Sequence, residues 1–171
     1  VRSRRQRQMC IRDSCITAHY FYEELSREIP VPVLHGIQKT VLEIRNKGIQ
    51  SVGIMATDGT IQSGIFQKEL ESMGMETVIP EPLYQQDIMD LIYRDIKAGL
   101  PPDMDKFRRV SNHLREKEAG VLVLGCTELS LIKKDYDIGD GYVDTLEVLA
   151  KYALKQCKKE VKEPYENLIK V

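Results

Sequence analysis

Residues 120–124 read GVLVL, and the turn Gly125-Cys126-Thr127 and a short helical pattern over 128–134 follow them directly. A run that is apolar at every position is typical of a strand that is buried on both faces, as in a parallel sheet. Because a helix comes next, the segment predicts a strand–turn–helix unit. Cys126 then lies at the carboxyl end of the strand and just before the helix.

The same alternation of short apolar runs and longer helical patterns extends outward over the chain from residue 15. Apolar residues recur every three or four positions in the longer segments, and Asp103 is a predicted N-cap. Strands alternating with helices indicate βαβ units, so the predicted fold class is α/β with parallel-type sheets flanked by helices. The predicted strands are 31–34, 51–56, 76–79, 120–124 and 142–143. The predicted helices are 17–29, 36–47, 61–73, 83–98, 103–117, 128–134 and 144–158.

Composition excludes several classes of protein. The chain has 171 residues, of which 42% are hydrophobic and 30% charged, as expected of a folded domain rather than a disordered chain. Its apolar runs are too short for a membrane span, and no apolar stretch of signal-peptide length follows the basic start. The expected location is therefore the cytoplasm.

Charge is distributed unevenly along the chain. Residues 1–14 contain five Arg and one Asp, whereas the remainder contains 20 Lys or Arg against 25 Asp or Glu. A mildly acidic body does not suit phosphate binding, so neither nucleic acid nor membrane is an expected partner. The basic arm has no aromatic residue and no apolar periodicity, which indicates disorder, with a nucleic-acid contact as the alternative.

Four cysteines occupy positions 10, 15, 126 and 157. Without a secretory signal, these are expected to be thiols rather than disulfides. Cys10, Cys15 and His19 form a loose C-x4-C-x3-H cluster, but no fourth ligand is evident, so no metal site is predicted.

Two of the cysteines occupy equivalent turns. Cys15 and Cys126 each precede a predicted helix, where the partial positive charge of unpaired amides would lower a thiol pKa. Threonines beside these turns could hold a carboxylate together with backbone amides. The alternative is that both cysteines are inert and buried. The threonines concerned are Thr17, Thr57, Thr60 and Thr127.

Three segments together resemble the aspartate/glutamate racemase family. Residues 14–22 (SCITAHYFY) resemble its first cysteine motif, 56–64 (ATDGTIQSG) its central threonine–glycine element, and 125–129 (GCTEL) its second cysteine motif. The Glu-Leu ending is more similar to the aspartate branch than to bacterial glutamate racemases. The segments occur in the family's order.

The resemblance implies an enzyme of two pseudo-symmetric α/β lobes, active without a cofactor and homodimeric at full length. Cys15 and Cys126 would be its acid/base pair. Inversion at Cα needs a base on one face of the substrate and an acid on the other, which explains the need for two thiols. In this interpretation 15–48 is a remnant of the first lobe, with a C-terminal helix 144–171 packing back on it, and 49–143 is the second lobe.

The resemblance also implies a set of residues that bind a small amino acid. Lys97 would meet a side-chain carboxylate, or else be a solvated lysine at a helix end. His19 could tune the Cys15 thiol or simply pack. The implied substrate-binding residues are Ile16, Thr17, Ala18, Thr57, Gly59, Thr60, Lys97 and Thr127.

Two departures from the family pattern matter. Ile16 stands where the family has Asn, which removes an amide that would contact substrate. Family members also carry about two more βα units before the first cysteine motif, whereas residues 1–14 offer no apolar strand. We therefore expect 1–14 to be foreign or disordered and the first lobe to be incomplete, with a genuine flexible tail as the alternative.

The leading hypothesis is a racemase that interconverts L- and D-aspartate, or glutamate, by two-cysteine acid/base chemistry. One alternative is a related isomerase of the maleate isomerase or hydantoin racemase type, in which a cysteine can act as a nucleophile. Another is a non-catalytic module that binds a dicarboxylate.

Overall fold

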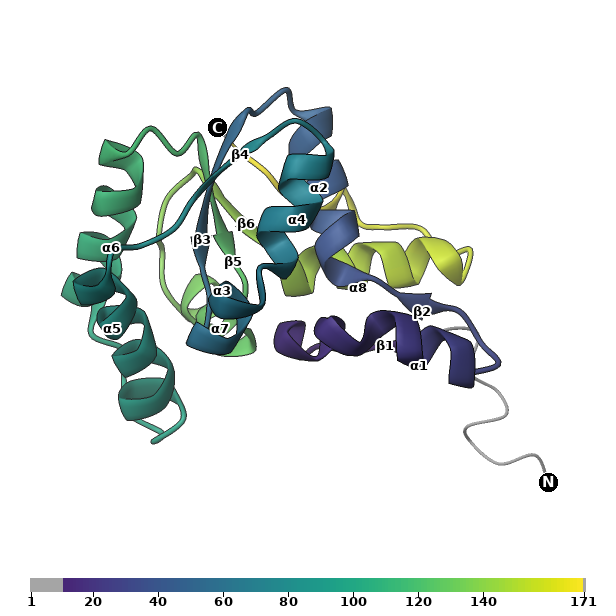
Figure 1. The fold of residues 1–171 in the computed structure, drawn as a ribbon, viewed down its shortest axis with the longest axis horizontal. Coiled ribbons are helices and arrows are strands. Elements are labelled where there is room, and N and C mark those ends of the chain that lie inside the picture. The colour runs from purple at the N-terminus through teal and green to yellow at the C-terminus, as the bar shows by residue number, and fades with distance from the viewer. Residues whose placement is uncertain (1–10, 171) are drawn as a thin grey trace.

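The computed structural model describes residues 11–170, and its central element is a four-stranded, fully parallel sheet of order β4-β3-β5-β6 (Figure 1). It confirms the predicted α/β class. All four strands lie within predicted strands, except that β6 runs one residue further. They are β3 (Ser51–Met55), β4 (Glu76–Val78), β5 (Val121–Leu124) and β6 (Tyr142–Asp144).

The two central strands, β3 and β5, form the core of the sheet. Val52 pairs with Val121 and Met55 with Leu124. Every residue of β5 is buried, as its uninterrupted apolar sequence predicts for a strand covered on both faces.

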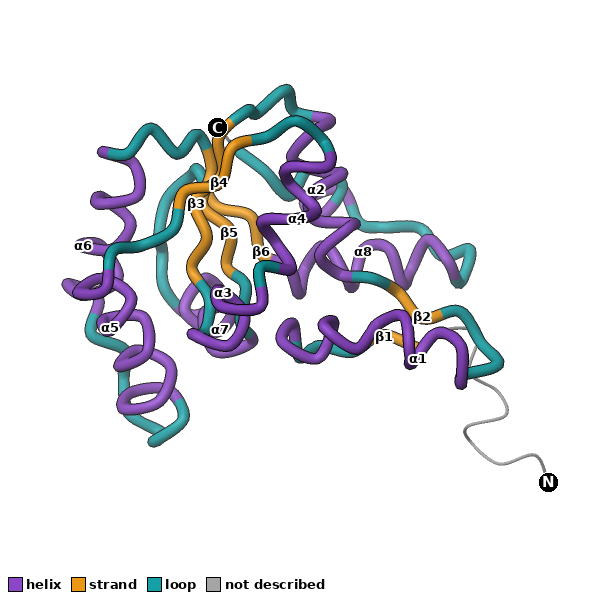
Figure 2. The backbone as a smooth tube through the Cα atoms, in the orientation of Figure 1, coloured by secondary structure: helices purple, strands orange, loops and turns teal. Residues whose placement is uncertain are grey.

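Helices cover both faces of the sheet (Figures 1 and 2). One apolar cluster joins α2 (Gly36–Asn46), α4 (Ile65–Ser72) and α8 (Thr145–Gln156) to one face. A second cluster joins four helical segments to the other face. These are α5 (Pro82–Asp90), the π-helix η3 (Leu91–Ile96), α6 (Met104–Glu116) and α7 (Thr127–Asp135).

The strand order reverses between β3 and β5. The chain leaves β3 through a short helix, α3 (Asp58–Ser63), and α4 toward β4 on one side, and it leaves β5 through α7 toward β6 on the other. In doubly wound sheets, ligands bind outside the carboxyl ends of the strands at such a switch point. The topology therefore predicts a ligand-binding site at the carboxyl ends of β3 and β5.

Two predicted helices are divided in the structure. Gly64 adopts a left-handed conformation with φ of 66°, which separates α3 from α4 within the predicted 61–73 helix and its preceding turn. The predicted 83–98 helix is α5 continued by the π-helix η3. The predicted N-cap is confirmed, because the Asp103 side chain accepts hydrogen bonds from the amides of Asp105 and Lys106.

The N-terminal part of the described chain lies beside the large sheet. A two-residue strand, β1 (Ile11–Arg12), pairs in parallel with β2 (Val33–Leu34), and between them run the 3-10 helix η2 (Ile16–Phe21) and α1 (Tyr22–Glu28). The expectation of no strand in 1–14 is thus wrong for this pair, which is too short to give an alternating pattern. Residues 1–10 of the predicted disordered arm, with Cys10, lie outside the described residues.

The predicted remnant 15–48 does not have a core of its own. Ile37, Val41 and Ile44 of α2 are fully buried against the large sheet. Helix α8 packs on α2, and the buried Lys151 ammonium lies 3.0 Å from a Glu43 carboxylate oxygen.

The C-terminal helix is shorter than the predicted 144–171. It ends at Gln156, and Lys158 has a φ of 54°, which a continuing helix does not permit. The segment beyond it returns to the sheet, where Leu168 and Ile169 are buried in the core.

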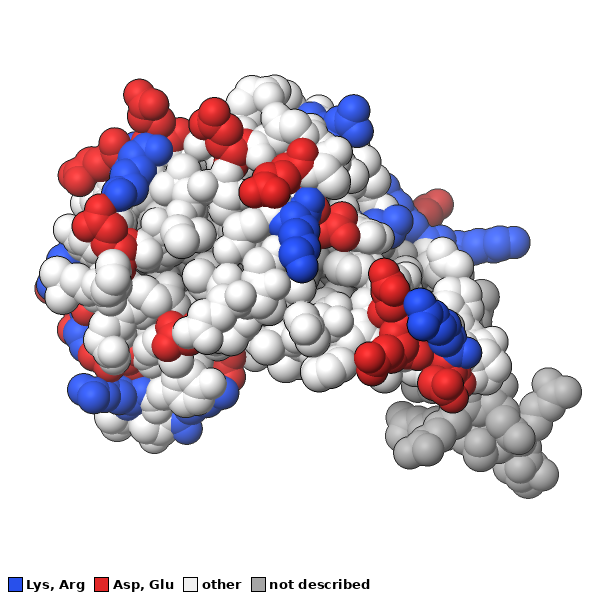
Figure 3. Space-filling model, in the orientation of Figure 1, with Lys and Arg blue, Asp and Glu red and all other residues white. Residues whose placement is uncertain are grey.

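On the face shown in Figure 3, the described acidic and basic side chains are interspersed. Among the described residues, no helix combines the length and apolar character that crossing a membrane requires.

Candidate active site

A pocket of about 280 Å³ lies at the switch point of the sheet, at the carboxyl ends of β3 and β5. It receives both cysteines of the predicted pair, one from the turn before η2 and one from the turn after β5. It is lined by Cys15, Ile16, Thr17, Thr57, Gly59, Met89, Tyr93, Lys97, Gly125, Cys126, Thr127 and Glu128.

Three threonine hydroxyls fasten the Cys15 segment to the end of β3. The Oγ1 atom of Thr17 lies 2.9 Å from that of Thr60 and 3.3 Å from that of Thr57, and the last two are 3.1 Å apart. Thr60 is fully buried and outside the pocket lining, so it supports the two threonines that do line the pocket. Gly59 lies beside this cluster, since a Cβ there would be in ordinary van der Waals contact with Thr17 Cγ2 at 3.5 Å.

Cys15 is exposed and occupies the N-cap position of η2. Its amide donates to Asp13 Oδ1 at 2.9 Å, and its carbonyl accepts from the Ala18 amide at 3.0 Å. Ala18, a predicted substrate-binding residue, does not line this pocket and instead faces a small separate cavity beside His19. Ile16 does line it, so an apolar side chain forms part of the wall.

Cys126 is held more firmly, between β5 and α7. The Gly125 amide donates to the Met55 carbonyl at 2.8 Å, which continues the β3–β5 pairing up to the cysteine. The Cys126 thiol donates to Glu128 Oε2 at 2.7 Å, and the Thr127 hydroxyl donates to the same oxygen at 2.8 Å. A carboxylate is thus in direct contact with the second thiol.

Lys97 completes this cluster from the other side of the pocket. Its ammonium lies 3.7 Å from Glu128 Oε1 and 4.2 Å from the centre of the Tyr93 ring. The lysine is almost half exposed, so we regard the ion pair as weak. The pocket therefore contains the ammonium group of Lys97, which is only weakly paired with Glu128.

The electrostatics of Cys126 differ from the sequence-based expectation. Burial and the hydrogen bond to Glu128 raise the pKa of the Cys126 thiol to about 12, so the expected lowering of its pKa is wrong. Burial alone would raise the pKa of Glu128, but the hydrogen bonds from Cys126 and Thr127 outweigh it and lower that pKa. Near neutral pH, Cys126 is thus protonated and the neighbouring Glu128 is ionised.

Removing the Glu128 charge should make Cys126 easier to ionise. In Glu128→Gln we expect the pKa of Cys126 to fall from about 12 toward its ordinary value of 9.0, without reaching it because the thiol stays buried. The measurement is the pH dependence of Cys126 alkylation by iodoacetamide, followed on its tryptic peptide. Glu147→Gln is the matched control, because that carboxylate pairs with Lys133 instead. An unchanged Cys126 profile in Glu128→Gln would contradict this account.

Sequence reasoning missed four lining residues, Gly125, Glu128, Met89 and Tyr93. Glu128 lies two positions after Cys126 in a quoted motif, but its role as the hydrogen-bond acceptor of the thiol needs the turn geometry. Met89, Tyr93 and Lys97 are spaced four residues apart, so a helical projection from Lys97 would have placed the other two on its face.

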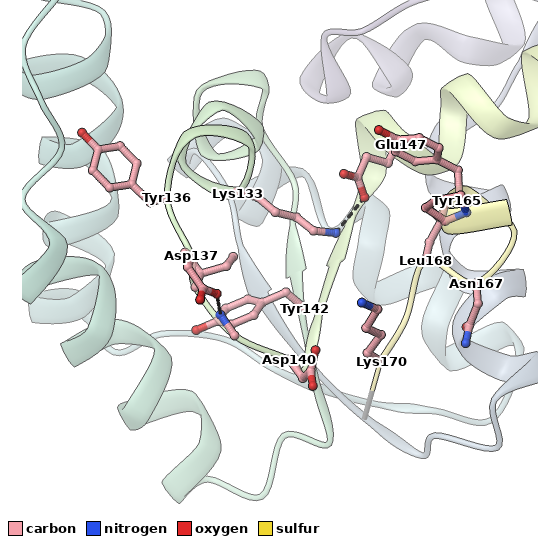
Figure 4. A pocket seen from close by; sticks show the side chains of 13 residues that line it. Lys133, Tyr136, Asp137, Asp140, Tyr142, Glu147, Tyr165, Asn167, Leu168 and Lys170 are labelled. Atoms are coloured by element: carbon pink, nitrogen blue, oxygen red, sulfur yellow. Dashed lines mark hydrogen bonds and ion pairs between the residues drawn. The ribbon is translucent and has the colours of Figure 1, made fainter. Parts of the chain in front are cut away.

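A larger pocket, of about 340 Å³, lies beside β6 at the free edge of the sheet, between α7 and the C-terminal segment (Figure 4). Lys133 and Glu147 form an ion pair across it at 2.7 Å, and Lys170 comes from the C-terminal segment. None of the three cysteines in the described residues lines it. We therefore identify the smaller pocket with two thiols as the candidate active site.

Among residues 11–170, no three His, Cys, Asp or Glu side chains gather as metal ligands. Cys10 of the C-x4-C-x3-H cluster lies outside that range. The described members, Cys15 and His19, are joined instead by a ring-to-carbonyl contact.

Fold and site together define a doubly wound parallel α/β protein with a two-thiol pocket at its strand switch point. The Asp/Glu/hydantoin racemase family matches residues 9–153. The chain belongs to this family. The match begins at residue 9, within the segment that the sequence analysis expects to be foreign or disordered.

Individual relatives agree with this assignment. The broad specificity amino-acid racemase RacX of Bacillus subtilis is 33% identical over 80% of this chain and 60% of its own length. The glutamate racemase of Aquifex aeolicus is 32% identical over 71% of this chain and 47% of its own. Among solved structures, Picrophilus torridus aspartate racemase superposes with a TM-score of 0.76 at 26% identity, over 96% of this chain and 69% of the other. The chain thus spans about half to two thirds of these relatives.

Proposed function

We propose that this protein is an amino-acid racemase that interconverts L- and D-aspartate, or glutamate, by a two-cysteine acid/base mechanism without a cofactor. The observation that carries the proposal is that Cys15 and Cys126, which are 111 positions apart in sequence, line one pocket from two different turns. Racemisation needs two proton-transferring groups around one Cα.

The raised pKa of Cys126 supports the following roles for the two thiols. Cys126 keeps its proton, because burial and Glu128 raise its pKa to about 12, so it serves as the acid. Cys15, the other thiol that lines the pocket, serves as the base for the first proton transfer. Once Cys126 has given up its proton, the neighbouring Glu128 charge makes the thiolate strongly basic, which suits it to the reverse direction.

Two regions of the pocket can bind the two carboxylates of an acidic amino acid. The hydroxyls of Thr17, Thr57 and Thr127 and the beginning of α7 suit the α-carboxylate, whose charge the helix N-terminus favours. The Lys97 ammonium suits the side-chain carboxylate of the substrate. Its ion pair with Glu128 is long, at 3.7 Å, so a substrate carboxylate can replace Glu128 as the partner of Lys97. This second contact favours acidic amino acids.

The test is deuterium incorporation at Cα. The protein is incubated in D₂O with each enantiomer of aspartate and glutamate, and NMR and chiral chromatography follow exchange and inversion. We expect both enantiomers of an acidic amino acid to exchange and invert. If none of the acidic amino acids undergoes exchange at Cα, the proposal is contradicted. A covalent adduct between a thiol and maleate would favour the maleate isomerase type. Tight binding of a dicarboxylate without exchange would favour a dicarboxylate-binding module.

A further inference from the structure

The two thiols of the pocket are held in different ways. Cys126 follows a central strand of the four-stranded sheet, whereas Cys15 precedes a 3-10 helix outside that sheet. Hydrogen bonds in a 3-10 helix have poorer geometry than those in an α-helix, so η2 by itself fixes Cys15 weakly. Besides the Thr17 contacts to the end of β3, a second contact with an element outside η2 holds the Cys15 backbone.

That contact runs through the imidazole ring of His19, a residue of η2 that is only 6% exposed. Its Nε2 lies 2.9 Å from the amide nitrogen of Gly36, and its Nδ1 lies 3.2 Å from the carbonyl oxygen of Cys15. Because a backbone amide can only donate, Nε2 must be the acceptor and carry no proton. The neutral ring then has its proton on Nδ1, which donates to Cys15.

Gly36, whose amide donates to the His19 ring, belongs to a packed helix. It is the first residue of α2, whose Ile37, Val41 and Ile44 are fully buried against the sheet. A Cβ at position 36 would lie 3.2 Å from His19 Nε2, which is closer than most Cβ contacts, so glycine allows the ring to approach. The ring thus joins the backbone of Cys15 to the packed end of α2.

The surroundings of His19 favour the neutral ring. The His35 ring contacts it edge-on at 5.2 Å between centroids and is in turn packed on Tyr22 at 4.4 Å. Burial is the main cause of the lowered pKa of His19, opposed by its bond to Cys15 and the charge of Asp13. Burial and His19 lower the pKa of His35 to about 4. Both rings are therefore neutral near pH 7.

We propose that His19 is a positioning residue, which fixes the Cys15 thiol in the pocket by bonding the Cys15 carbonyl to the first amide of α2. Its effect on turnover rests on the proposed function, but its effect on the Cys15 backbone does not. The two are therefore measured separately.

The backbone arm uses His19→Leu and His19→Asn with hydrogen–deuterium exchange. Leucine keeps an apolar side chain in the space but forms neither bond, whereas asparagine can still donate to the Cys15 carbonyl. In His19→Leu we expect the amides of residues 16–19 and Gly36 to exchange about tenfold faster or more, with Val121–Leu124 unchanged as an internal reference. In His19→Asn we expect faster exchange at Gly36 but near-normal exchange at Ala18, whose amide shares the Cys15 carbonyl.

The kinetic arm compares kcat with KM in Cα exchange. We expect His19→Leu to lose about 100-fold in kcat with little change in KM, as for a misplaced reacting group, and His19→Asn to recover at least tenfold of that loss. Wild-type exchange at 16–19 in His19→Leu, or equal kinetic loss in both variants, would overturn the proposal. If the wild type turns over no amino acid, the proposed function fails, and the exchange data alone decide whether His19 holds Cys15.

Discussion

Inversion at the substrate Cα is expected to fall by about 10²- to 10⁴-fold in Cys126→Ser and in Cys15→Ser, the range that a positioned acid or base contributes. A serine hydroxyl fills nearly the same space as a thiol but ionises far less readily near neutral pH. Each variant retains one thiol in the pocket. It can therefore remove a proton from one face of Cα but cannot supply one to the other.

The two variants should differ in the enantiomer that they still exchange. With one thiol left, deuterium enters without inversion, and the susceptible enantiomer in Cys15→Ser is the opposite of that in Cys126→Ser. Cys157→Ser is the matched control, because that thiol does not line the pocket. NMR in D₂O with chiral chromatography measures both quantities. Inversion at the wild-type rate in either pocket variant would exclude the two-thiol mechanism.

Phe66→Ala is expected to lower the free energy of unfolding by about 3–5 kcal/mol, because it removes a fully buried aromatic ring from the core. The ring belongs to the cluster between α4 and the sheet. It also lies under the second cysteine turn, since a Cβ at Gly125 would be 3.2 Å from its Cε2 atom. The cavity therefore weakens both the fold and the support of Cys126.

Urea denaturation followed by circular dichroism measures this loss. Phe21→Ala is the matched control, because the Phe21 ring is 53% exposed and its removal should cost less than about 0.5 kcal/mol. Similar losses in the two variants would show that Phe66 does not carry the expected packing energy.

Much of the fold follows from local sequence patterns. The run at 120–124 is apolar at every position and becomes β5, which is buried throughout. Asp103 supplies a helix cap in the predicted place. Such features depend on neighbours a few residues away. Other features leave too weak a pattern in the sequence to predict. Examples are the division of a helix at Gly64 and the two-residue strand β1.

The candidate site was predictable in its residue types but not in its electrostatics. Two cysteines before helices and the threonines beside them come from the sequence, and six of the eight expected binding residues do line the pocket. Thr60 and Ala18 do not, because one is buried behind the other threonines and the other faces away beside His19.

The sequence by itself determined the α/β class, the family motifs and the presence of two thiols in strand–helix turns, because each of these depends on short-range patterns of residue type. Only the tertiary structure decided how the thiols are held and charged. Burial and a 2.7 Å contact with Glu128 raise the pKa of Cys126, and His19 joins the Cys15 carbonyl to the amide of Gly36, which is 17 positions from His19. Burial and hydrogen-bond geometry act over a few ångströms in space, and no spacing along the chain encodes them.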